Sequence, residues 1–427
     1  MQGDSRSHGL WEQSAPPAPY TASLRGALTV DAAIIGAGFT GLSAALHLRQ
    51  LGRTVAVVES VDIGFGGSGR NVGLVNAGLW VPPEDVNRAL GPVYGPRLVA
   101  QLGAAPALVF ELIERHGIAC EAVRNGTLHC AAGERGYREI AERARQWHAL
   151  GAPVELLDAR RAAEKLGTDA YTGALLDRRA GTIQPLAYAR GLATAAIAAG
   201  AHVFTSSPVE RVDEAAGCWS LKTPQGSVQA PWVVVASNAY SSAVWPQLRE
   251  EVVGLPYFNL ATRPLSEAER TGILPERQGV WDTRQILSSL RFDARHRLVF
   301  GSVGALRGTG ARIHRRWGRR ALRQLFPQLR GIDFEHEWFG RIGMTSDAIP
   351  RFHRLGRNVV SISGYNGRGI APGTTFGRDL ARLVAGKVDA QDLAIPETAV
   401  GQPAFRQARE AFYEIGSQVA HMVGARL

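Results

Sequence analysis

The sequence predicts an α/β fold in which two domains, each assembled from separate segments, share one chain. Three observations lead to this prediction: a glycine-rich strand–turn–helix–strand unit near the N-terminus, a second strand–glycine loop–helix unit near the C-terminus, and alternating strand patterns between them. Parallel strands joined through helices form one sheet covered on both faces, so the two glycine-rich units should share a domain. At 427 residues the chain is long enough to place a second domain between them.

A dinucleotide-binding pattern occupies residues 30–59. An apolar strand at 32–35 leads into Gly36-Ala37-Gly38-Phe39-Thr40-Gly41, then a helical pattern, then a second apolar strand that ends at Glu59. Gly36 permits the tight turn, Gly38 lets the backbone approach a pyrophosphate, and Gly41 lets the helix pack on the strand. The free N–H groups at the helix N-terminus would hold the phosphate, and Glu59 would accept hydrogen bonds from ribose hydroxyls.

The next stretch, Ser60 to Gly73, is a loop with five glycines in its last ten residues. Such a composition does not hold a regular element, so the backbone should bend closely round something. A nicotinamide dehydrogenase would normally continue with another strand–helix unit, whereas this loop suits a protein that lays a flat ring against backbone. The alternative is a flexible surface loop that binds nothing.

A second glycine-rich turn lies near the C-terminus. The strand pattern Val359–Ser363 precedes the loop Gly364 to Ala371, which contains Tyr365, Gly367 and Arg368, and a helix should run from about residue 372 to 385. Backbone N–H groups from Gly369 through Ile370 to Ala371, the helix N-terminus and Arg368 would stabilise the negative charge of a reduced flavin ring. This loop favours a flavin site over a nicotinamide site.

Shorter patterns fill the rest of the chain. Helical patterns cover residues 98–116, 134–150, 186–199 and about 312–325, and strand patterns cover residues 126–130, 173–176, 202–205, 209–212, 219–223, 232–236 and 297–301. The apolar run at 232–236 should rejoin the N-terminal sheet. The helix near 312–325 has a basic outer face over an apolar one.

Composition limits the classes of protein. The net charge is +10, but no stacking aromatics follow a groove, so no nucleic-acid partner is expected. Cys120, Cys130 and Cys218 lack metal spacing, which predicts no metal site and suits a reducing cytoplasm. We expect no transmembrane segment, because no apolar run reaches about 18 residues. The first 29 residues have no apolar signal region and are expected to form an extended surface arm.

In combination, these motifs resemble the D-amino-acid oxidase-like family of FAD-dependent amine oxidoreductases. The resemblance is carried by GAGFTG with Glu59, SGRNVG at 68–73, VVASNAY at 234–240 and GYNGRGIAP at 364–372. It implies a Rossmann-like FAD-binding domain interleaved with a substrate domain built on a largely antiparallel β-sheet (α+β). The implied organisation is an arm at 1–29, an FAD-binding domain at 30–90, 177–245 and 340–400, a substrate domain at 91–176 and 246–339, and a C-terminal helix at 401–427.

The resemblance also implies which residues bind FAD. These are Gly36, Gly38, Phe39, Thr40, Gly41, Glu59, Ser60, Gly67, Ser68, Arg70, Asn71, Val72, Gly73, Val209, Ala236, Asn238, Gly340, Gly364, Gly367, Gly369, Ile370 and Ala371. Family members that attach FAD covalently use a cysteine near the segment equivalent to 341–347. None is present there, so non-covalent FAD is expected.

Hydride transfer from an amine to flavin N5 depends on positioning rather than on a general base. A substrate carboxylate needs a cation, and Arg291, Arg368 and Arg341 are the candidates. Tyr257 and Tyr365, with Phe258 and Trp80, are expected to wall the substrate site. The electron acceptor, oxygen or a respiratory quinone, is left open.

Two segments, 66–82 and 174–185, are most similar to the bacterial L-pipecolate oxidases. The resemblance therefore implies a secondary or cyclic amino acid as substrate, L-pipecolate first, oxidised to the cyclic imine that opens to aminoadipate semialdehyde in lysine catabolism. γ-Glutamylputrescine or another N-substituted amine is the alternative within the family. An RNA-binding modification protein, motivated by the basic charge, is the alternative from another class.

Overall fold

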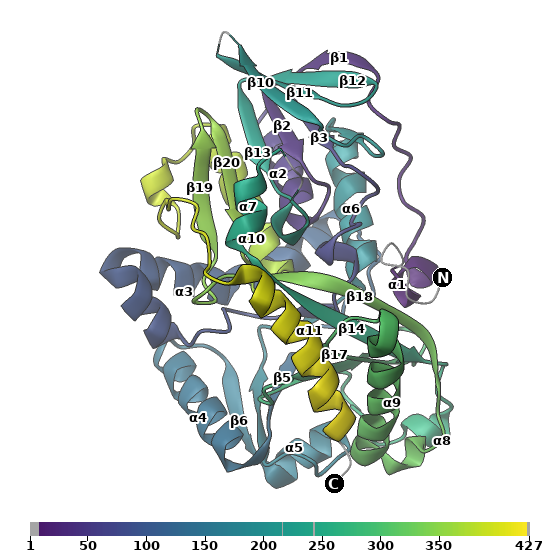
Figure 1. Cartoon of the computed structure of the whole chain (residues 1–427). Coiled ribbons are helices and arrows are strands. Elements are labelled where there is room, and N and C mark those ends of the chain that lie inside the picture. The colour runs from purple at the N-terminus through teal and green to yellow at the C-terminus, as the bar shows by residue number, and fades with distance from the viewer. Residues whose placement is uncertain (1–7, 216, 242–243, 425–427) are drawn as a thin grey trace.

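The computed structural model describes residues 8–215, 217–241 and 244–424 (Figure 1). Its first layer is a six-stranded sheet. In spatial order the strands are β19 (Arg351–Gly356), β20 (Val359–Ser363), β13 (Trp232–Val235), β2 (Ala32–Ile35), β3 (Val55–Val58) and β9 (His202–Phe204). All neighbours are parallel except β19 and β20. The predicted return of segment 232–236 to the N-terminal sheet is confirmed.

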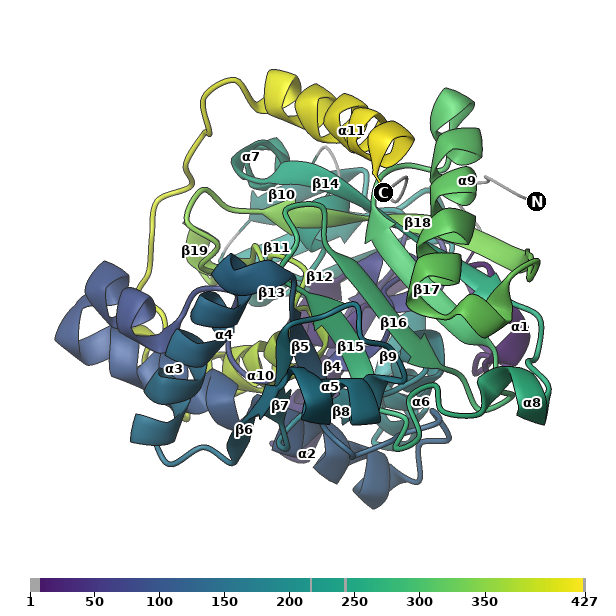
Figure 2. The same ribbon diagram turned by 90° about the horizontal axis from the view of Figure 1, so that it is seen from below.

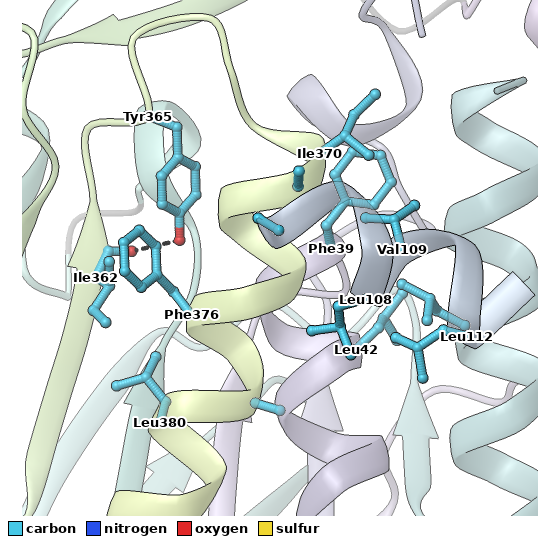
Figure 3. Packing of buried hydrophobic residues seen from close by; sticks show 14 of the residues in the cluster. Phe39, Leu42, Leu108, Val109, Leu112, Ile362, Tyr365, Ile370, Phe376 and Leu380 are labelled. Atoms are coloured by element: carbon cyan, nitrogen blue, oxygen red, sulfur yellow. Dashed lines mark hydrogen bonds between the residues drawn. The ribbon is translucent and has the colours of Figure 1, made fainter. Parts of the chain in front are cut away.

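Both faces of this sheet are covered, which is why β2 and β3 are entirely apolar and buried. Helices α2 (Phe39–Gln50), α10 (Ile370–Val384), α3 (Pro83–His116) and α6 (Pro185–Ala198) pack on one side. Figure 3 shows Phe39 of α2, Val109 of α3 and Ile370 of α10 close together there, while Phe376 of α10 lies beside Ile362 of β20. A four-stranded sheet of β1 (Gly26–Thr29), β12 (Gly226–Ala230), β11 (Cys218–Lys222) and β10 (Arg211–Ala215) covers the other side.

The second domain is built on an eight-stranded sheet. In spatial order its strands are β18 (Phe334–Met344), β14 (Val253–Thr262), β17 (Leu298–Val303), β16 (Ser288–Phe292), β15 (Gly279–Asp282), β5 (Thr127–Ala131), β7 (Gly173–Asp177) and β6 (Val154–Asp158). Only the β15–β5 pair is parallel, so the expected antiparallel character is observed. The two-stranded pair β4 (Leu74–Val75) and β8 (Gly181–Thr182) lies apart from these sheets.

The helices of the second domain are α4 (Gly133–Ala149), α5 (Ala159–Leu166), α9 (Gly308–Leu325) and α11 (Arg406–Val423), with the short helix α8 (Glu267–Arg270). The short helix α7 (Pro246–Glu251) instead packs on the first domain, where Leu248 joins the core beside β2, β3 and β13. Figure 2 shows α11 and α9 side by side on the outside of the β14–β18 end of the sheet. Strand β18 runs across the expected boundary at 340. The division into domains otherwise stays a prediction.

Two expectations need correction. The N-terminal arm is not wholly superficial, because α1 (Leu10–Ser14) buries Leu10 and Trp11, and Trp11 packs edge-on against Trp338 at 5.3 Å between ring centroids. Residues 1–7 of that arm lie outside the described residues, as do residues 425–427 of the C-terminal segment. The strand expected at 209–212 begins at Arg211.

One segment of the chain is longer and more apolar than the sequence analysis predicted. Helix α3 contains an 18-residue window whose length and mean hydropathy of 1.3 would suffice to cross a bilayer, but 56% of that window is buried inside the protein. A buried helix in the core of a protein can have the same length and mean hydropathy. The helix is also kinked at Gly91, which has φ 73°.

Candidate active site

The carboxyl ends of β2, β3, β13 and β20 meet at one edge of the parallel sheet, where ligands of such sheets bind. The turn after β2 is shaped by its glycines. Gly36 adopts φ 106°, and a Cβ on Gly41 would lie 2.0 Å from the carbonyl oxygen of Gly36. Helix α2 can therefore approach the turn only because residue 41 has no side chain. The N-terminus of α2, with Gly38 as N-cap, faces the space above the turn.

Glu59 lies at the end of β3 and holds this turn. Its Oε2 accepts a hydrogen bond from the Ala37 N–H at 2.9 Å, and its Oε1 accepts from the Val61 N–H at 3.0 Å. The carboxylate is thereby fixed beside the glycine turn, where it lines a cavity. This is the position that a ribose-binding acid needs.

The loop from Ser60 to Gly73 is ordered by its own side chains. The Asn71 amide donates to the carbonyl oxygens of Gly67 and Ser68 at 3.0 and 2.9 Å, and the Ser68 hydroxyl accepts from the Phe39 N–H at 3.0 Å. Arg70 Nε donates to the Phe65 carbonyl oxygen at 2.8 Å. The bond from Phe39 ties the loop to the start of α2, and the other three hold the loop in one conformation, so it is not a flexible surface loop.

The second glycine turn touches the first. The hydroxyls of Tyr365 and Thr40 lie 2.7 Å apart, although 325 residues separate them, and Tyr365 also donates to the Ile362 carbonyl oxygen at 3.0 Å, as Figure 3 shows. Asn238, after β13, accepts from the Gly364 N–H at 3.0 Å. Turns that follow four different strands therefore form one rim.

Below this rim lies a cavity of about 530 Å³. Most of the residues expected to bind FAD line it. They are Gly36, Gly38, Phe39, Thr40, Glu59, Ser60, Gly67, Ser68, Arg70, Asn71, Val72, Val209, Ala236, Asn238, Gly340, Gly367, Gly369 and Ile370. The cavity spans from the turn before α2 to the turn before α10, as a long coenzyme held at both ends requires.

Four expected contacts lie behind this lining. They are Gly41, Gly73, Gly364 and Ala371. A Cβ on Gly73 would lie 2.0 Å from the Ile183 carbonyl oxygen, and one on Gly364 would lie 2.4 Å from Thr345 Cγ2. Ala371 is buried within the first turn of α10. These residues shape the turns by close packing rather than by facing the cavity.

Arg368 is a buried cation of the cavity wall. It is 6% exposed, and its guanidinium lies over the Trp80 and Trp281 rings at 5.1 and 4.8 Å from their centroids. Nη1 donates to the Ala77 carbonyl oxygen at 2.8 Å, whereas Nε has no hydrogen-bond partner among the described residues. Burial, reinforced by the nearby charge of Arg143, holds the pKa of Arg368 well below its usual range. An anion bound in the cavity would relieve this cost.

Arg341 also lines the cavity but is exposed, on β18. Its backbone N–H donates to the Tyr240 hydroxyl at 2.8 Å. Arg368 and Arg341 therefore differ in environment, one deep between indole rings and one open to solvent. The third arginine of the cavity lining, Arg70, is buried and donates to the carbonyl oxygens of Phe65 and Phe339.

Arg291 does not line the cavity, so the prediction that it binds the substrate carboxylate is wrong. On β16 it shares the face of the cavity residue Ser289, but it lies farther along the strand. Its guanidinium donates to the carbonyl oxygens of Phe292 and Ile183 and lies 3.7 Å from the carboxylate of Glu121. Burial lowers the pKa of Arg291 to about 10. It is a buried structural cation.

Replacing Arg291 by methionine should therefore destabilise the fold rather than weaken substrate binding. Loss of the guanidinium leaves the Ile183 carbonyl oxygen without its donor and removes the charge partner of Glu121, which still accepts from the Ala294 N–H. Breaking such a largely buried pair costs about 3 kcal/mol. Urea unfolding monitored by circular dichroism measures this change. An unchanged midpoint together with a raised KM would return Arg291 to the substrate site.

The aromatic wall was only partly predicted. Tyr257 lines the cavity, and its hydroxyl lies 2.6 Å from that of Ser289. Phe258 points the other way, into the core against Trp317, because neighbouring strand residues face opposite sides. Trp80 and Trp281 form an edge-to-face pair with centroids 4.8 Å apart. Nothing in the sequence near Trp281 marked it as a cavity residue.

The fold, and a cavity that runs between two glycine-rich turns, define a flavin-dinucleotide-dependent oxidoreductase. Residues 31–383 match the family model described as DAO, FAD dependent oxidoreductase, so the chain belongs to this family and its cofactor is FAD. The glycine cradle fits FAD, since a Cβ on Gly38 would lie 2.9 Å from Ser68 Oγ and narrow the turn. Membership of this FAD-dependent family excludes the nicotinamide alternative.

Three relatives support the assignment. The chain is 31% identical to γ-glutamylputrescine oxidoreductase of Escherichia coli strain K12, over 88% of both chains. It is 31% identical to the probable oxidoreductase OrdL of Haemophilus influenzae, over 83% of both. The crystal structure of glycine oxidase from Geobacillus kaustophilus has the same fold, with a TM-score of 0.71 at 22% identity over 88% of this chain and 100% of the other. The protein is an FAD-dependent amine or amino-acid oxidoreductase.

We expect FAD to be held without a covalent bond. Among the described residues that line the cavity there is neither a cysteine nor a histidine. Precipitating the yellow protein with trichloroacetic acid should therefore release all flavin absorbance into the supernatant. A pellet that stays yellow would contradict this expectation. No cluster of three or more metal-ligating side chains occurs within the described ranges.

Proposed function

We propose that the protein oxidises a small secondary or cyclic amino acid, with L-pipecolate as the first candidate. The single observation that carries this proposal is Arg368, a buried cation in the cavity wall, next to the Gly369–Ile370 turn. A carboxylate is the partner that a buried guanidinium binds best, because it accepts two parallel hydrogen bonds. A carboxylate placed there would bring its α-carbon to the turn before α10.

The surroundings of Arg368 support an apolar body on the substrate. Trp80 and Trp281 flank the guanidinium, and Tyr257 and Leu255 of β14 lie in the same cavity. Ring methylenes would bury apolar surface against these side chains, at roughly 0.8 kcal/mol for each CH₂. A five- or six-membered ring that carries a carboxylate satisfies both the cation and the walls.

Bound FAD supplies the hydride acceptor, and the product imine then hydrates in water. The side chains of the site hold and orient the substrate. Burial raises the pKa of both Tyr257 and Tyr365 above the usual range, so both hydroxyls stay protonated and act as hydrogen-bonding groups rather than bases. Positioning of a neutral amine is therefore the main contribution of the protein.

γ-Glutamylputrescine is the second candidate. It is supported by the relative from Escherichia coli that is named for this substrate, and by Arg341, the exposed arginine of the cavity lining. In that conjugate the carboxylate lies far from the amine that is oxidised. An exposed cation away from the deep end of the cavity would bind the carboxylate of this longer substrate. The two candidates therefore assign the carboxylate to different arginines.

Anaerobic mixing of the holoprotein with L-pipecolate, D-pipecolate, L-proline, sarcosine, glycine and γ-glutamylputrescine distinguishes the candidates. Loss of the flavin band near 450 nm reports reduction. We expect a cyclic L-amino acid to bleach the flavin fastest. Bleaching by γ-glutamylputrescine alone would overturn the L-pipecolate proposal in favour of the second candidate.

A further inference from the structure

Helix α11 packs on the protein with its apolar face turned toward solvent. Phe412, Ile415 and Val419 are 69%, 62% and 51% exposed, and Met422 and Val423 on the same side are 42% and 68% exposed. Surface helices normally turn such a stripe toward the core. The amphipathic pattern is thus present on α11, but inverted with respect to solvent.

Polar contacts hold the inner face of α11. His421 and His314 of α9 place their Nδ1 atoms 2.8 Å apart, and Glu414 forms an ion pair with Arg307. Glu410 Oε1 accepts from the Gly254 N–H of β14 at 2.8 Å. These bonds come from the whole length of the helix, so its orientation is fixed rather than incidental. Figure 1 shows α11 lying across the outside of β14, beside α9.

The neighbouring helix α9 supplies positive charge. Between Gly308 and Leu325 it has six arginines and no acidic residue. Arg315 and Arg319 are paired with Glu337 and Asp333, and Arg320 donates to the His421 carbonyl oxygen, which ties the two helices together. The three that remain are exposed: Arg312, Arg316 and Arg323. No ion pair is formed by these three within the described part of the chain.

We propose that α11 and α9 dock this protein on an anionic phospholipid surface. The apolar face of α11, defined by Phe412, Ile415, Val419, Met422 and Val423, would enter the boundary between headgroups and acyl chains. The exposed arginines of α9 would bind lipid phosphates. Both acidic residues of α11, Glu410 and Glu414, are turned inward with arginine partners, so no carboxylate of that helix faces the lipid.

A second copy of the chain is the competing occupant, because Ala408, Phe412, Ile415, Val419 and Met422 follow a heptad spacing. Paired helices need complementary charges beside such a seam. Here the flanking positions are Arg409, Ala411, Gly416, Gln418 and Val423. They offer one cation and no anion, so they do not select a second copy. The charge of the surroundings instead matches an anionic bilayer.

Sedimentation of the holoprotein with sucrose-loaded vesicles tests the proposal. Vesicles of phosphatidylglycerol and phosphatidylcholine should carry the protein down, whereas pure phosphatidylcholine vesicles should carry much less. Val419→Glu should abolish binding, while the control Leu150→Glu, at a site 55% exposed on another part of the surface, should not. Arg312→Gln with Arg316→Gln should weaken binding about tenfold or more. The matched pair Arg135→Gln with Arg138→Gln, exposed on α4, should leave it unchanged.

Each variant must keep its flavin absorbance and melting temperature, so that lost binding reports the surface and not the fold. Failure of the wild-type holoprotein to bind anionic vesicles would overturn the proposal. So would retained binding by the Val419→Glu variant. A concentration-dependent dimer in sedimentation equilibrium, abolished by Val419→Glu and accompanied by no vesicle binding, would assign the face to a second copy instead.

Discussion

Replacing Arg368 by methionine is expected to raise the KM for the amino acid that reduces the flavin by about 100-fold, the loss expected for a charge-assisted, bidentate contact. Methionine keeps much of the side-chain volume between Trp80 and Trp281 but removes the charge. FAD should be retained, because the glycine turns and Glu59 are untouched. Steady-state kinetics with a matched flavin content measures the change.

Arg341→Met is the control for this result, since Arg341 lines the same cavity but is exposed. It should leave the KM for a small amino acid within about threefold, because a solvated cation contributes little. Arg368→Lys should recover part of the binding, as it restores charge without the planar fork. Equal KM values for the Arg368→Met variant and the wild type would remove Arg368 from the substrate site. A large effect of Arg341→Met alone would favour the longer substrate.

Replacing Gly41 by alanine should abolish FAD binding and destabilise the protein by about 3 kcal/mol, because the new methyl group collides with backbone. Its Cβ would lie 2.0 Å from the carbonyl oxygen of Gly36 and 3.2 Å from a side-chain methyl of Ile34. Helix α2 must then move away from the turn that its N-terminus completes. Flavin absorbance after purification and the thermal melting temperature report the two losses.

Gly416→Ala provides the matched control, since it makes the same change inside another helix. There the nearest atom to a new Cβ, Phe412 Cζ, is 3.9 Å away. Alanine favours helix by up to about 1 kcal/mol over glycine, so this variant should melt at the same or a higher temperature with full FAD. If Gly41→Ala behaved like Gly416→Ala, the close approach of α2 to its turn would be refuted.

The FAD end of the cavity could be predicted from the sequence because each of its turns directly follows its own strand. Gly36, Glu59 and Gly369 are marked by local patterns, and the parallel sheet brings the strand ends to one edge. The predicted and the observed cavity residues differ at a few glycines that are required for close packing. Behind the cavity wall, for example, Gly73 is required by its close approach to the Ile183 carbonyl oxygen, and Gly364 by its close approach to the Thr345 side chain.

The substrate end could not be predicted in the same way. Trp281 meets Trp80 and Arg368 only because β15 pairs with β5 within the eight-stranded sheet, a long-range pairing that no local pattern specifies. Arg291 was a reasonable candidate by residue type and strand position, but its distance along β16 takes it past the cavity. A helical pattern likewise cannot say which face of α11 is turned to solvent.

Binding of an inert substrate analogue tests the central claim, that one cavity holds FAD and presents Arg368 to a carboxylate. Tetrahydropyran-2-carboxylate has the ring and the carboxylate of pipecolate but an oxygen in place of the amine, so it cannot be oxidised in the same way. Titrated into the yellow holoprotein, it should perturb the flavin spectrum saturably, and the Kd should rise about 100-fold in the Arg368→Met variant but not in the Arg341→Met variant. An equal Kd in the Arg368→Met variant and the wild type would contradict the claim.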